Sequence, residues 1–452
     1  MQIIVVGCGK VGATLAEQLS NETHDITIVD TNAEKVQKLA NAYDVMGVVG
    51  NGASYSTLME AGIEVADLLI AVTGSDEQNL LCCLFAKKTG NCQTIARVRN
   101  PIYNNDIRYI KDELGLSMTI NPEYTAATEI ARLLRFPSAI KIDTFSRGKV
   151  ELIKFKIKPE YKLHGFKIMD VRSKLKCDIL VCAVERGDEV VIPDGNFTLA
   201  EEDLVSIVGT PVNSTTFFEK IGIPTNRIKD AIIVGGGKIT YYLAEQLKDM
   251  RISLSIIESD KSRCEELSES FPKAIVIHGD GTDKNILLEE GLKSAEAFIA
   301  LTNMDEENIL LSLYAKSQTD AKLVAKINRI TFDDVINKLD VGSIIYPKYI
   351  TANYILRYVR GMQNSIGDNI ETLYKIIDNK AEAIEFKVSG DSSLVNRTLD
   401  EMSLKSNLLI ASIYRNGKVI IPSGQDFFLP EDLVVVITTN PGLKDLKDIL
   451  KK

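Results

Sequence analysis

The sequence predicts an α/β protein built from two tandem, doubly wound units, each followed by a small β-rich α+β module. Three observations support this prediction. Short apolar runs alternate with amphipathic segments, which is typical of a parallel sheet covered by helices on both faces. The same order of elements returns in the second half of the chain. A glycine-rich loop follows the first apolar run of each half.

The first doubly wound unit is expected over residues 1–121. Its predicted strands are QIIVV, DITIVD, VMGVVG, LLIAVT, TIARVR and SMTI. Helical patterns such as VGATLAEQL and EQNLLCCLFAKK separate these strands. Strands that alternate with amphipathic helices indicate βαβ units, in which consecutive strands run parallel.

The second doubly wound unit is expected over residues 230–346, because this region repeats the first. LLIAVTGSDEQNLLCCLFAKK at 68–88 matches AFIALTNMDEENILLSLYAKS at 297–317. INPEYTAATEIARLLR at 120–135 matches IYPKYITANYILRYVR at 345–360. We interpret the chain as a tandem duplication.

The β-rich modules are expected over residues 141–222 and 368–450. VELIKFKI and DLVSIVGT in the first module correspond to AIEFKV and DLVVVITT in the second. Each module also has a tight turn between two apolar runs, which is typical of antiparallel strands. The segment 213–230, NSTTFFEKIGIPTNRIKD, is the best candidate for a linker. The chain therefore reads as an A-B-A-B series.

Composition excludes several classes of function. The 452 residues exceed the roughly 100–200 typical of one domain. A formal net charge of -9 argues against a nucleic-acid partner, which needs clustered Lys and Arg. Seven cysteines form no CxxC pair, which suits a reducing cytosol. No apolar run is long enough to span a bilayer, and the first residues do not read as a signal peptide.

The first glycine loop has the features of a dinucleotide-binding site. Gly7, Gly9 and Gly12 fit G-x-G-x-x-G directly after a strand and at the start of a helix. They permit a tight turn, close approach of a pyrophosphate and close packing of helix on strand. Asp30 ends the next strand, where its carboxylate can accept hydrogen bonds from ribose. The alternative is that the glycines only end a strand and Asp30 caps a helix.

The second loop departs from this pattern. Gly235 and Gly237 occupy the first two positions, but Thr240 replaces the third glycine and Glu258 replaces the aspartate. A Thr side chain at this point should push helix and strand apart, which would loosen the phosphate cradle or alter its ligand. The alternative is a degenerate, structural copy that binds nothing. The two sites are not expected to be equivalent.

Further candidates lie after the later strands, where ligands of doubly wound sheets bind. GNGAS at 50–54 and GDGTD at 279–283 could border an adenosine, or they could be plain turns. Thr73-Gly74 and Thr302-Asn303 follow the fourth strands. Ser75 with Gln78, and Asn303 with Glu306, also resemble helix caps.

Two basic residues end the fifth strands. Arg97 in IARVR could donate charge-assisted hydrogen bonds to phosphate, and Lys326 is its counterpart. Each could instead be an ordinary solvated surface charge.

The sequence offers no catalytic constellation. Hydride transfer needs an acid or base beside the nicotinamide, and the three histidines stand apart from one another. Cys8 inside the loop could be a redox-sensitive thiol, although a small filler residue is the simpler interpretation. GGGKIT lacks the spacing of a phosphate-binding P-loop. We therefore expect no enzyme; an NAD-dependent oxidoreductase is the alternative.

The A-B-A-B order, with GCGKVG, IVD, AVTGSDEQN and IARVR, resembles the TrkA family, the cytosolic regulatory subunits of bacterial and archaeal Trk potassium uptake systems. The doubly wound units look like the Rossmann-like RCK N-terminal domains of this family, and the modules look like RCK C-terminal domains. The resemblance covers nearly the whole chain. Thr240 is a departure that puts the second nucleotide site in doubt.

The resemblance implies NAD(H) at the first site and ATP or ADP at either site. The first site would comprise Gly7, Cys8, Gly9, Lys10, Val11, Gly12, Asp30, Asn51, Thr73, Gly74 and Arg97. The second would comprise Gly235, Gly236, Gly237, Lys238, Ile239, Glu258 and Asp280. No metal site is expected.

The resemblance also implies a cytoplasmic, peripheral protein that docks on a TrkH/TrkG-like membrane potassium transporter. It would assemble as a ring of RCK units, as a homotetramer, with two fused units supplying neighbouring positions. The apolar faces of EYTAATEIARLLRF and KYITANYILRYVR fit packing against a neighbouring unit, or against their own. The expected function is nucleotide-controlled gating of potassium uptake.

Overall fold

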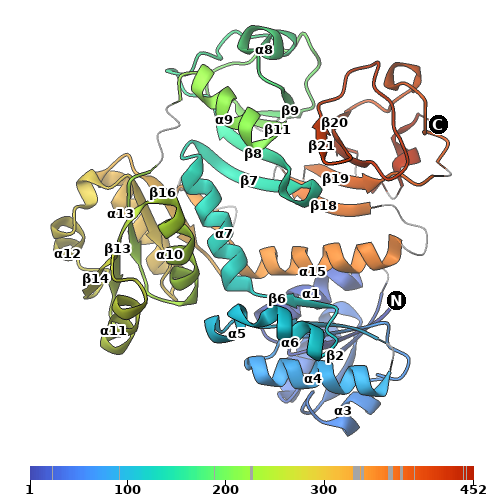
Figure 1. Cartoon of the computed structure of the whole chain (residues 1–452), viewed down its shortest axis with the longest axis vertical. Coiled ribbons are helices and arrows are strands. Elements are labelled where there is room, and N and C mark those ends of the chain that lie inside the picture. Colours follow the sequence, from blue (N-terminus) through green and yellow to red (C-terminus); the bar gives the residue numbers. More distant parts are fainter. Residues whose placement is uncertain are drawn as a thin grey trace. The chain divides into compact units, whose positions relative to one another are not determined.

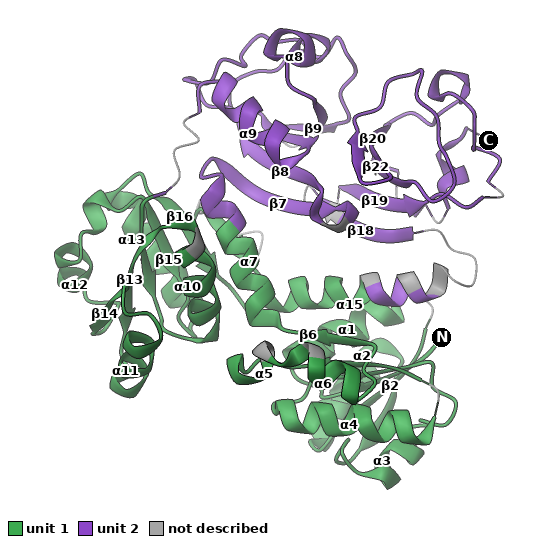
Figure 2. Ribbon diagram, in the orientation of Figure 1, with its two compact units in different colours: residues 1–131, 229–356 green, residues 132–228, 357–452 purple. Residues whose placement is uncertain are grey.

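The protein is described by a computed structural model of the full chain. It describes residues 1–22, 24–90, 92–187, 189–223, 228–328, 336, 339, 341–364, 370–376, 380–390, 392–440, 442, 443 and 445–451. The chain divides into two compact units (Figure 2). Unit 1 contains a first copy, residues 1–131, and a second copy, residues 229–356. Unit 2 contains a first module, residues 132–228, and a second module, residues 357–452.

The first copy is a six-stranded parallel sheet in the order β3-β2-β1-β4-β5-β6. Its strands are β1 (Gln2–Val6), β2 (Asp25–Asp30), β3 (Met46–Val49), β4 (Leu68–Ala71), β5 (Gln93–Arg97) and β6 (Met118–Ile120). Its helices are α1 (Lys10–Ser20), α2 (Ala33–Tyr43), α3 (Tyr55–Glu60), α4 (Asp76–Thr89), α5 (Pro101–Asn105), α6 (Ile107–Glu113) and α7 (Pro122–Arg135).

The second copy, residues 229–356, coloured from yellow-green to orange in Figure 1, repeats this sheet in the order β14-β13-β12-β15-β16-β17. Its strands are β12 (Asp230–Val234), β13 (Ser253–Glu258), β14 (Ile275–His278), β15 (Ala297–Ala300), β16 (Lys322–Lys326) and β17 (Ser343–Ile345). Its helices are α10 (Lys238–Met250), α11 (Lys261–Ser270), α12 (Lys284–Glu289), α13 (Asp305–Gln318) and α15 (Pro347–Asn364), with a 3₁₀ turn η2 (Leu292–Ser294). The predicted duplication is confirmed.

The central strands carry the cores of both copies. β4 and β15 are buried along their whole length, as continuous apolar runs in a covered parallel sheet should be. β2 and β4 lie on opposite sides of β1, and β13 and β15 lie on opposite sides of β12. The strand order therefore reverses at β1 and at β12. This reversal opens a crevice at the carboxyl ends of the strands, which is where ligands of such sheets bind.

The modules of unit 2 are five-stranded antiparallel sheets, ordered β10-β9-β11-β8-β7 and β18-β19-β22-β20-β21. The first contains β7 (Ala139–Phe145), η1 (Ser146–Gly148), β8 (Val150–Lys156), α8 (Ile168–Leu175), β9 (Ile179–Arg186), β10 (Glu189–Val191), β11 (Leu204–Gly209) and α9 (Pro211–Lys220). The second contains β18 (Ile370–Ile376), β19 (Ala381–Lys387), η3 (Leu399–Glu401), β20 (Leu408–Arg415), β21 (Lys418–Ile420), β22 (Leu433–Thr438) and η4 (Leu446–Ile449).

The two modules share one apolar core. Val150, Leu152 and Cys182 of the first module pack in the same buried cluster as Ala411 and Val435 of the second. The Phe145 ring meets the Tyr374 ring edge to face at 5.0 Å between centroids. Unit 2 is therefore one folded body made from two homologous halves.

The expected linker over 213–230 is wrong for its first half. Residues 211–220 form helix α9, which begins with Pro211 after a Thr210 cap and buries Phe217 and Phe218. The segment looked polar because of its Asn, Ser and Thr residues, but Ser214 is buried together with Phe217 and Phe218, and the exposed side chains are those of Val212, Glu219 and Lys220. Residues 224–227 lie outside the described residues. Of the described helices, none combines the length and apolar content that a bilayer crossing needs.

Candidate functional site

The first glycine loop joins β1 to α1 in a backbone conformation that needs its glycines. Gly7 has φ +108°, a region that residues with a side chain rarely adopt, and its N–H donates to the Val29 carbonyl at 2.7 Å. A Cβ on Gly12 would stand 1.8 Å from the Gly7 carbonyl oxygen. A Cβ on Gly9 would meet no atom within 4 Å. The loop is closed by two glycines, and the third leaves backbone open to a ligand.

Asp30 is held at the mouth of this loop. Its Oδ2 accepts a hydrogen bond from the Cys8 N–H at 2.6 Å, and its Oδ1 accepts one from the Asn32 N–H at 2.9 Å. Each carboxylate oxygen keeps a second lone pair, so the side chain can still accept from ribose hydroxyls. Asp30 does not cap α2, because Asn32 is the cap residue.

The second loop repeats this geometry with different side chains. Gly235 has φ +101°, and the Gly236 N–H donates to Glu258 Oε2 at 2.6 Å. Glutamate is one methylene longer than aspartate, and a Cβ on Gly236 would stand 2.9 Å from that oxygen. In the first copy the loop residue is the larger Cys8 and the strand residue is the shorter Asp30; in the second copy the loop residue is Gly236 and the strand residue is the longer Glu258. The hydrogen bond from the loop N–H to the carboxylate is the same in both copies.

Thr240 leaves the turn of the second loop in place, and the loosening of the phosphate cradle stays a prediction. Thr240 is fully buried, and its hydroxyl donates to the Gly235 carbonyl. That carbonyl corresponds to the one a Cβ on Gly12 would strike. The side chain therefore replaces a close backbone contact by a hydrogen bond, and the turn at Gly235 keeps its form.

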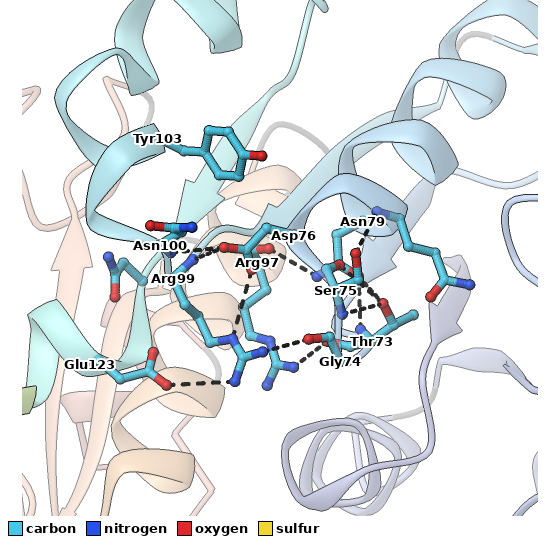
Figure 3. A network of polar contacts seen from close by, with 12 residues as sticks. Thr73, Gly74, Ser75, Asp76, Asn79, Arg97, Arg99, Asn100, Tyr103 and Glu123 are labelled. Atoms are coloured by element: carbon cyan, nitrogen blue, oxygen red, sulfur yellow. Dashed lines mark hydrogen bonds and ion pairs between the residues drawn. The ribbon is translucent and has the colours of Figure 1, made fainter. Parts of the chain in front are cut away.

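Arg97 and Arg99 hold the segment after β4 (Figure 3). The Arg97 guanidinium donates to the Thr73 carbonyl, and Arg99 Nη2 donates to the Gly74 carbonyl at 2.6 Å. Burial, and then the charge of Arg99, lower the pKa of Arg97 to about 10. The Arg97 Nε is buried without a hydrogen-bond partner among the described residues. An anion beside Arg97 would offset both effects.

The same framework supports both copies. Asn79 Oδ1 accepts from the Thr73 N–H at 2.8 Å, and Asn308 Oδ1 accepts from the Thr302 N–H at 2.9 Å. Each amide also donates to the carbonyl at the end of the fifth strand. Ser75 caps α4 by accepting from the Gln78 N–H at 3.2 Å, as predicted.

The cap predicted at Asn303 with Glu306 is wrong. Helix α13 begins at Asp305 and follows Met304, which offers no side-chain cap. Lys326 is also not a surface charge, since it is 7% exposed and donates to the Leu301 carbonyl at 3.2 Å. Burial lowers the pKa of Lys326.

A cavity of about 550 Å³ lies over the first loop. This volume is in the range of about 300–1,000 Å³ that holds small ligands. Of the predicted residues it is lined by Gly7, Gly9, Lys10, Val11, Asp30, Thr73, Gly74 and Arg97. Cys8, Gly12 and Asn51 do not line it. Asn51 instead accepts a hydrogen bond from Gln78 Nε2 at 2.7 Å, and burial, with the Asp30 charge, raises the pKa of the Cys8 thiol to about 12.

Sequence reasoning missed several residues of this cavity. They are Lys35, Gln78, Arg99, Pro122, Glu123, Asn328, Pro347 and Lys348. The last three belong to the second copy. The repeat offers one signal for them, because Pro347-Lys348 is the counterpart of Pro122-Glu123 in the aligned segments.

Comparison with known proteins gives two domain families over most of the chain. The TrkA-N domain matches residues 3–122 and 231–347, and the TrkA-C domain matches residues 152–222 and 383–451. The chain belongs to the TrkA family. The resemblance seen in the sequence is thereby confirmed, as is the fold of two tandem domain pairs.

Curated relatives of this TrkA-family chain align along its length. A Trk system potassium uptake protein TrkA homologue of Methanosarcina mazei is 32% identical over 462 residues, covering 100% of both chains. The Trk system potassium uptake protein TrkA of Halomonas elongata is 33% identical, covering 93% of this chain and 92% of its own. That of Haemophilus influenzae is 30% identical, covering 96% and 95%.

Solved structures share the fold at low identity. The GsuK channel superposes with a TM-score of 0.64 at 18% identity, covering 97% of this chain and 77% of the channel chain. The isolated GsuK RCK domain gives 0.63, with 97% and 92% coverage. These superpositions show that the TrkA-family chain shares its fold with GsuK, and at 18% identity they show the fold alone.

The second cavity of the TrkA-family chain, about 660 Å³, lies over the second glycine loop. Of the predicted residues it is lined by Gly235, Gly236, Gly237, Glu258 and Asp280, and not by Lys238 or Ile239. Its lining residues all belong to the second copy. Arg263 crosses the loop, where its Nε donates to the Gly236 carbonyl at 2.6 Å.

The two cavities differ in charge. Among the described residues, the first is lined by Lys10, Lys35, Arg97, Arg99 and Lys348 against Asp30 and Glu123. The second is lined by Arg263 against Glu258, Asp260, Asp280 and Glu307. The first cavity therefore offers a multiply charged anion more opposing charge than the second does. No group of acidic, His or Cys side chains in the described part of the chain is arranged to hold a metal ion.

Proposed function

We propose that this chain is a cytoplasmic nucleotide-binding regulatory subunit that gates a Trk-type membrane potassium transporter. The first cavity carries the proposal. It combines an open glycine loop, a carboxylate positioned for ribose and an excess of cations for phosphate. The full-length relatives named as Trk potassium uptake proteins support the potassium-transport role.

The ligand of the first site is proposed to be NAD(H), with ATP or ADP at either site. Structural neighbours are described as a GsuK channel bound to NAD and as GsuK bound to ADP. Asp30 would accept from the ribose hydroxyls, the backbone around Gly9 would approach the pyrophosphate, and Arg97 would face the phosphates. The residues predicted from the sequence are proposed to bind the nucleotide. The domains are proposed to span residues 1–121, 141–222, 230–346 and 368–450.

The subunit is proposed to act without catalysis, as a homotetrameric ring on the inner face of the membrane, docked on a TrkH/TrkG-like partner. A nucleotide shifts the ring only through its difference in affinity for two arrangements. Each tenfold ratio of affinities is worth about 1.4 kcal/mol. Tight binding that is equal in both arrangements would regulate nothing.

Potassium flux tests the proposal. The transporter would be reconstituted with and without this subunit, and nucleotide concentration would be varied. Flux should depend on nucleotide only when the subunit is present. Flux that is indifferent to both would overturn the function, and mass spectrometry of nucleotide retained by the purified chain would identify the ligand. Substrate-dependent oxidation of NADH would favour the oxidoreductase instead.

A further inference from the structure

The first cavity is built by both copies of the α/β domain. Pro347 and Lys348 begin helix α15 of the second copy, yet they line the cavity over the glycine loop of the first. Asn328, also from the second copy, lies in the same wall. The second cavity receives no such residues from the first copy. A ligand that fills the first cavity would therefore touch both copies.

The two copies place opposite charges at corresponding positions of this cavity. Glu123 of the first copy and Lys348 of the second are counterparts in the repeat, and both line the cavity. Glu123 lies 3.8 Å from Arg99, so its charge is already opposed. Lys348 forms no ion pair with any described residue. The second copy thus brings to the first site a cation whose described contact is the Tyr349 ring, 4.9 Å from its Nζ to the ring centroid, and not a carboxylate.

A second lysine faces Lys348 from the glycine loop. Burial, and then the positive charge of Lys10, lower the pKa of Lys348, while the charges of Glu17 and Asp305 oppose the shift more weakly. Lys10 also forms no ion pair with a described residue. Two like charges that share a partly buried cavity repel each other. An anion bound between them would relieve that repulsion and pair with both.

We propose that Lys348 is the phosphate contact that the second copy supplies to the first nucleotide site, where it binds the anion jointly with Lys10. This inference rests on the proposed function, because it assigns a role within the same site. It makes first-site affinity depend on the position of the second copy. A nucleotide would therefore favour arrangements that keep Lys348 in the cavity.

Hydrogen exchange tests this proposal on the full chain, because the loops at 7–12 and 235–240 lie in different peptides and report on each site separately. ATP would be titrated against the wild type, Lys348→Gln and Lys348→Arg. Lys348→Gln loses one charge-assisted hydrogen bond to ATP, so protection of loop 7–12 should need an ATP concentration about tenfold higher than in the wild type. Lys348→Arg should restore most of the affinity, and loop 235–240 should respond as in the wild type.

Lys273→Gln is the matched control. Lys273 is exposed on the second copy and does not line the first cavity, so this substitution removes the same charge at a different place. The affinity of Lys348→Gln should also depend less steeply on ionic strength than that of the wild type. An ATP affinity at loop 7–12 within twofold of the wild type would overturn the role of Lys348. No response of either loop to ATP, ADP or NAD in the wild type would instead overturn the nucleotide-binding function itself.

Discussion

At the scale of single residues, the glycines of the first loop have separate tasks. Gly12 is needed for packing, because a Cβ there would strike the Gly7 carbonyl oxygen at 1.8 Å. Gly9 has ordinary extended backbone, at φ −72°, and open space where a Cβ would stand. Stability should therefore depend on Gly12, and ligand approach on Gly9.

Gly12→Ala is expected to destabilise the fold by about 1–3 kcal/mol, the usual cost of overpacking a rigid contact. Gly9→Ala should leave the melting temperature unchanged and weaken ATP binding, because the methyl group occupies the approach to the loop backbone. Thermal unfolding and calorimetry with ATP measure the two effects. A Gly12→Ala chain as stable as the wild type, or a Gly9→Ala chain with full ATP affinity, would contradict this division.

At the scale of elements, helices α7 and α10 connect the two copies within unit 1. Tyr242 of α10 is 1% exposed, and its hydroxyl donates to the Arg99 carbonyl at 3.0 Å. Its ring meets the Tyr124 ring edge to face at 5.6 Å, and Gln246 donates to Thr128 at 3.1 Å. Helix α7 thus packs against the neighbouring copy, one of the two alternatives that its apolar face left open.

Tyr242→Phe should lower the free energy of unfolding by about 1 kcal/mol, the net value of one hydrogen bond. Tyr242→Ala should lower it by about 3–5 kcal/mol, as for a large aromatic removed from a core. Thermal unfolding gives the loss, and hydrogen exchange should show faster opening of α7 and α10. Tyr241→Phe is the control, because Tyr241 packs on Phe271 inside its own copy. Equal exchange of α7 in the Tyr242 and Tyr241 variants would contradict the contact.

At the scale of the whole molecule, the duplication has produced two cavities with different linings, and two modules that share one apolar core. Because the copies are fused, Lys348 of the second copy lines the first cavity. The second cavity has a mostly acidic lining. The modules pair through a shared core, with Glu385 accepting from the backbone and hydroxyl of Ser146 at 2.6 and 2.7 Å. A single chain thus contains the neighbour contacts that separate subunits would otherwise make.

The proposed ring of four chains should have a mass of about four times the 49.9 kDa chain mass. Light scattering coupled to size exclusion would measure it, with and without ATP. The mass should not change with ATP, since regulation is expected from rearrangement and not from assembly. A mass of one chain at micromolar concentration would exclude the ring as the resting form of the free subunit.

The sequence by itself determined the duplicated α/β fold, both glycine loops and the acids at the ends of β2 and β13. These follow from local periodicity and short fixed spacings, which the backbone obeys wherever the segment lies. Only the tertiary structure decided that Thr240 preserves its loop, because a buried hydroxyl found an acceptor that no spacing reveals. It also decided that Lys348 lines the first cavity. That proximity comes from the packing of one copy on the other, across more than half the chain, and no local pattern encodes it.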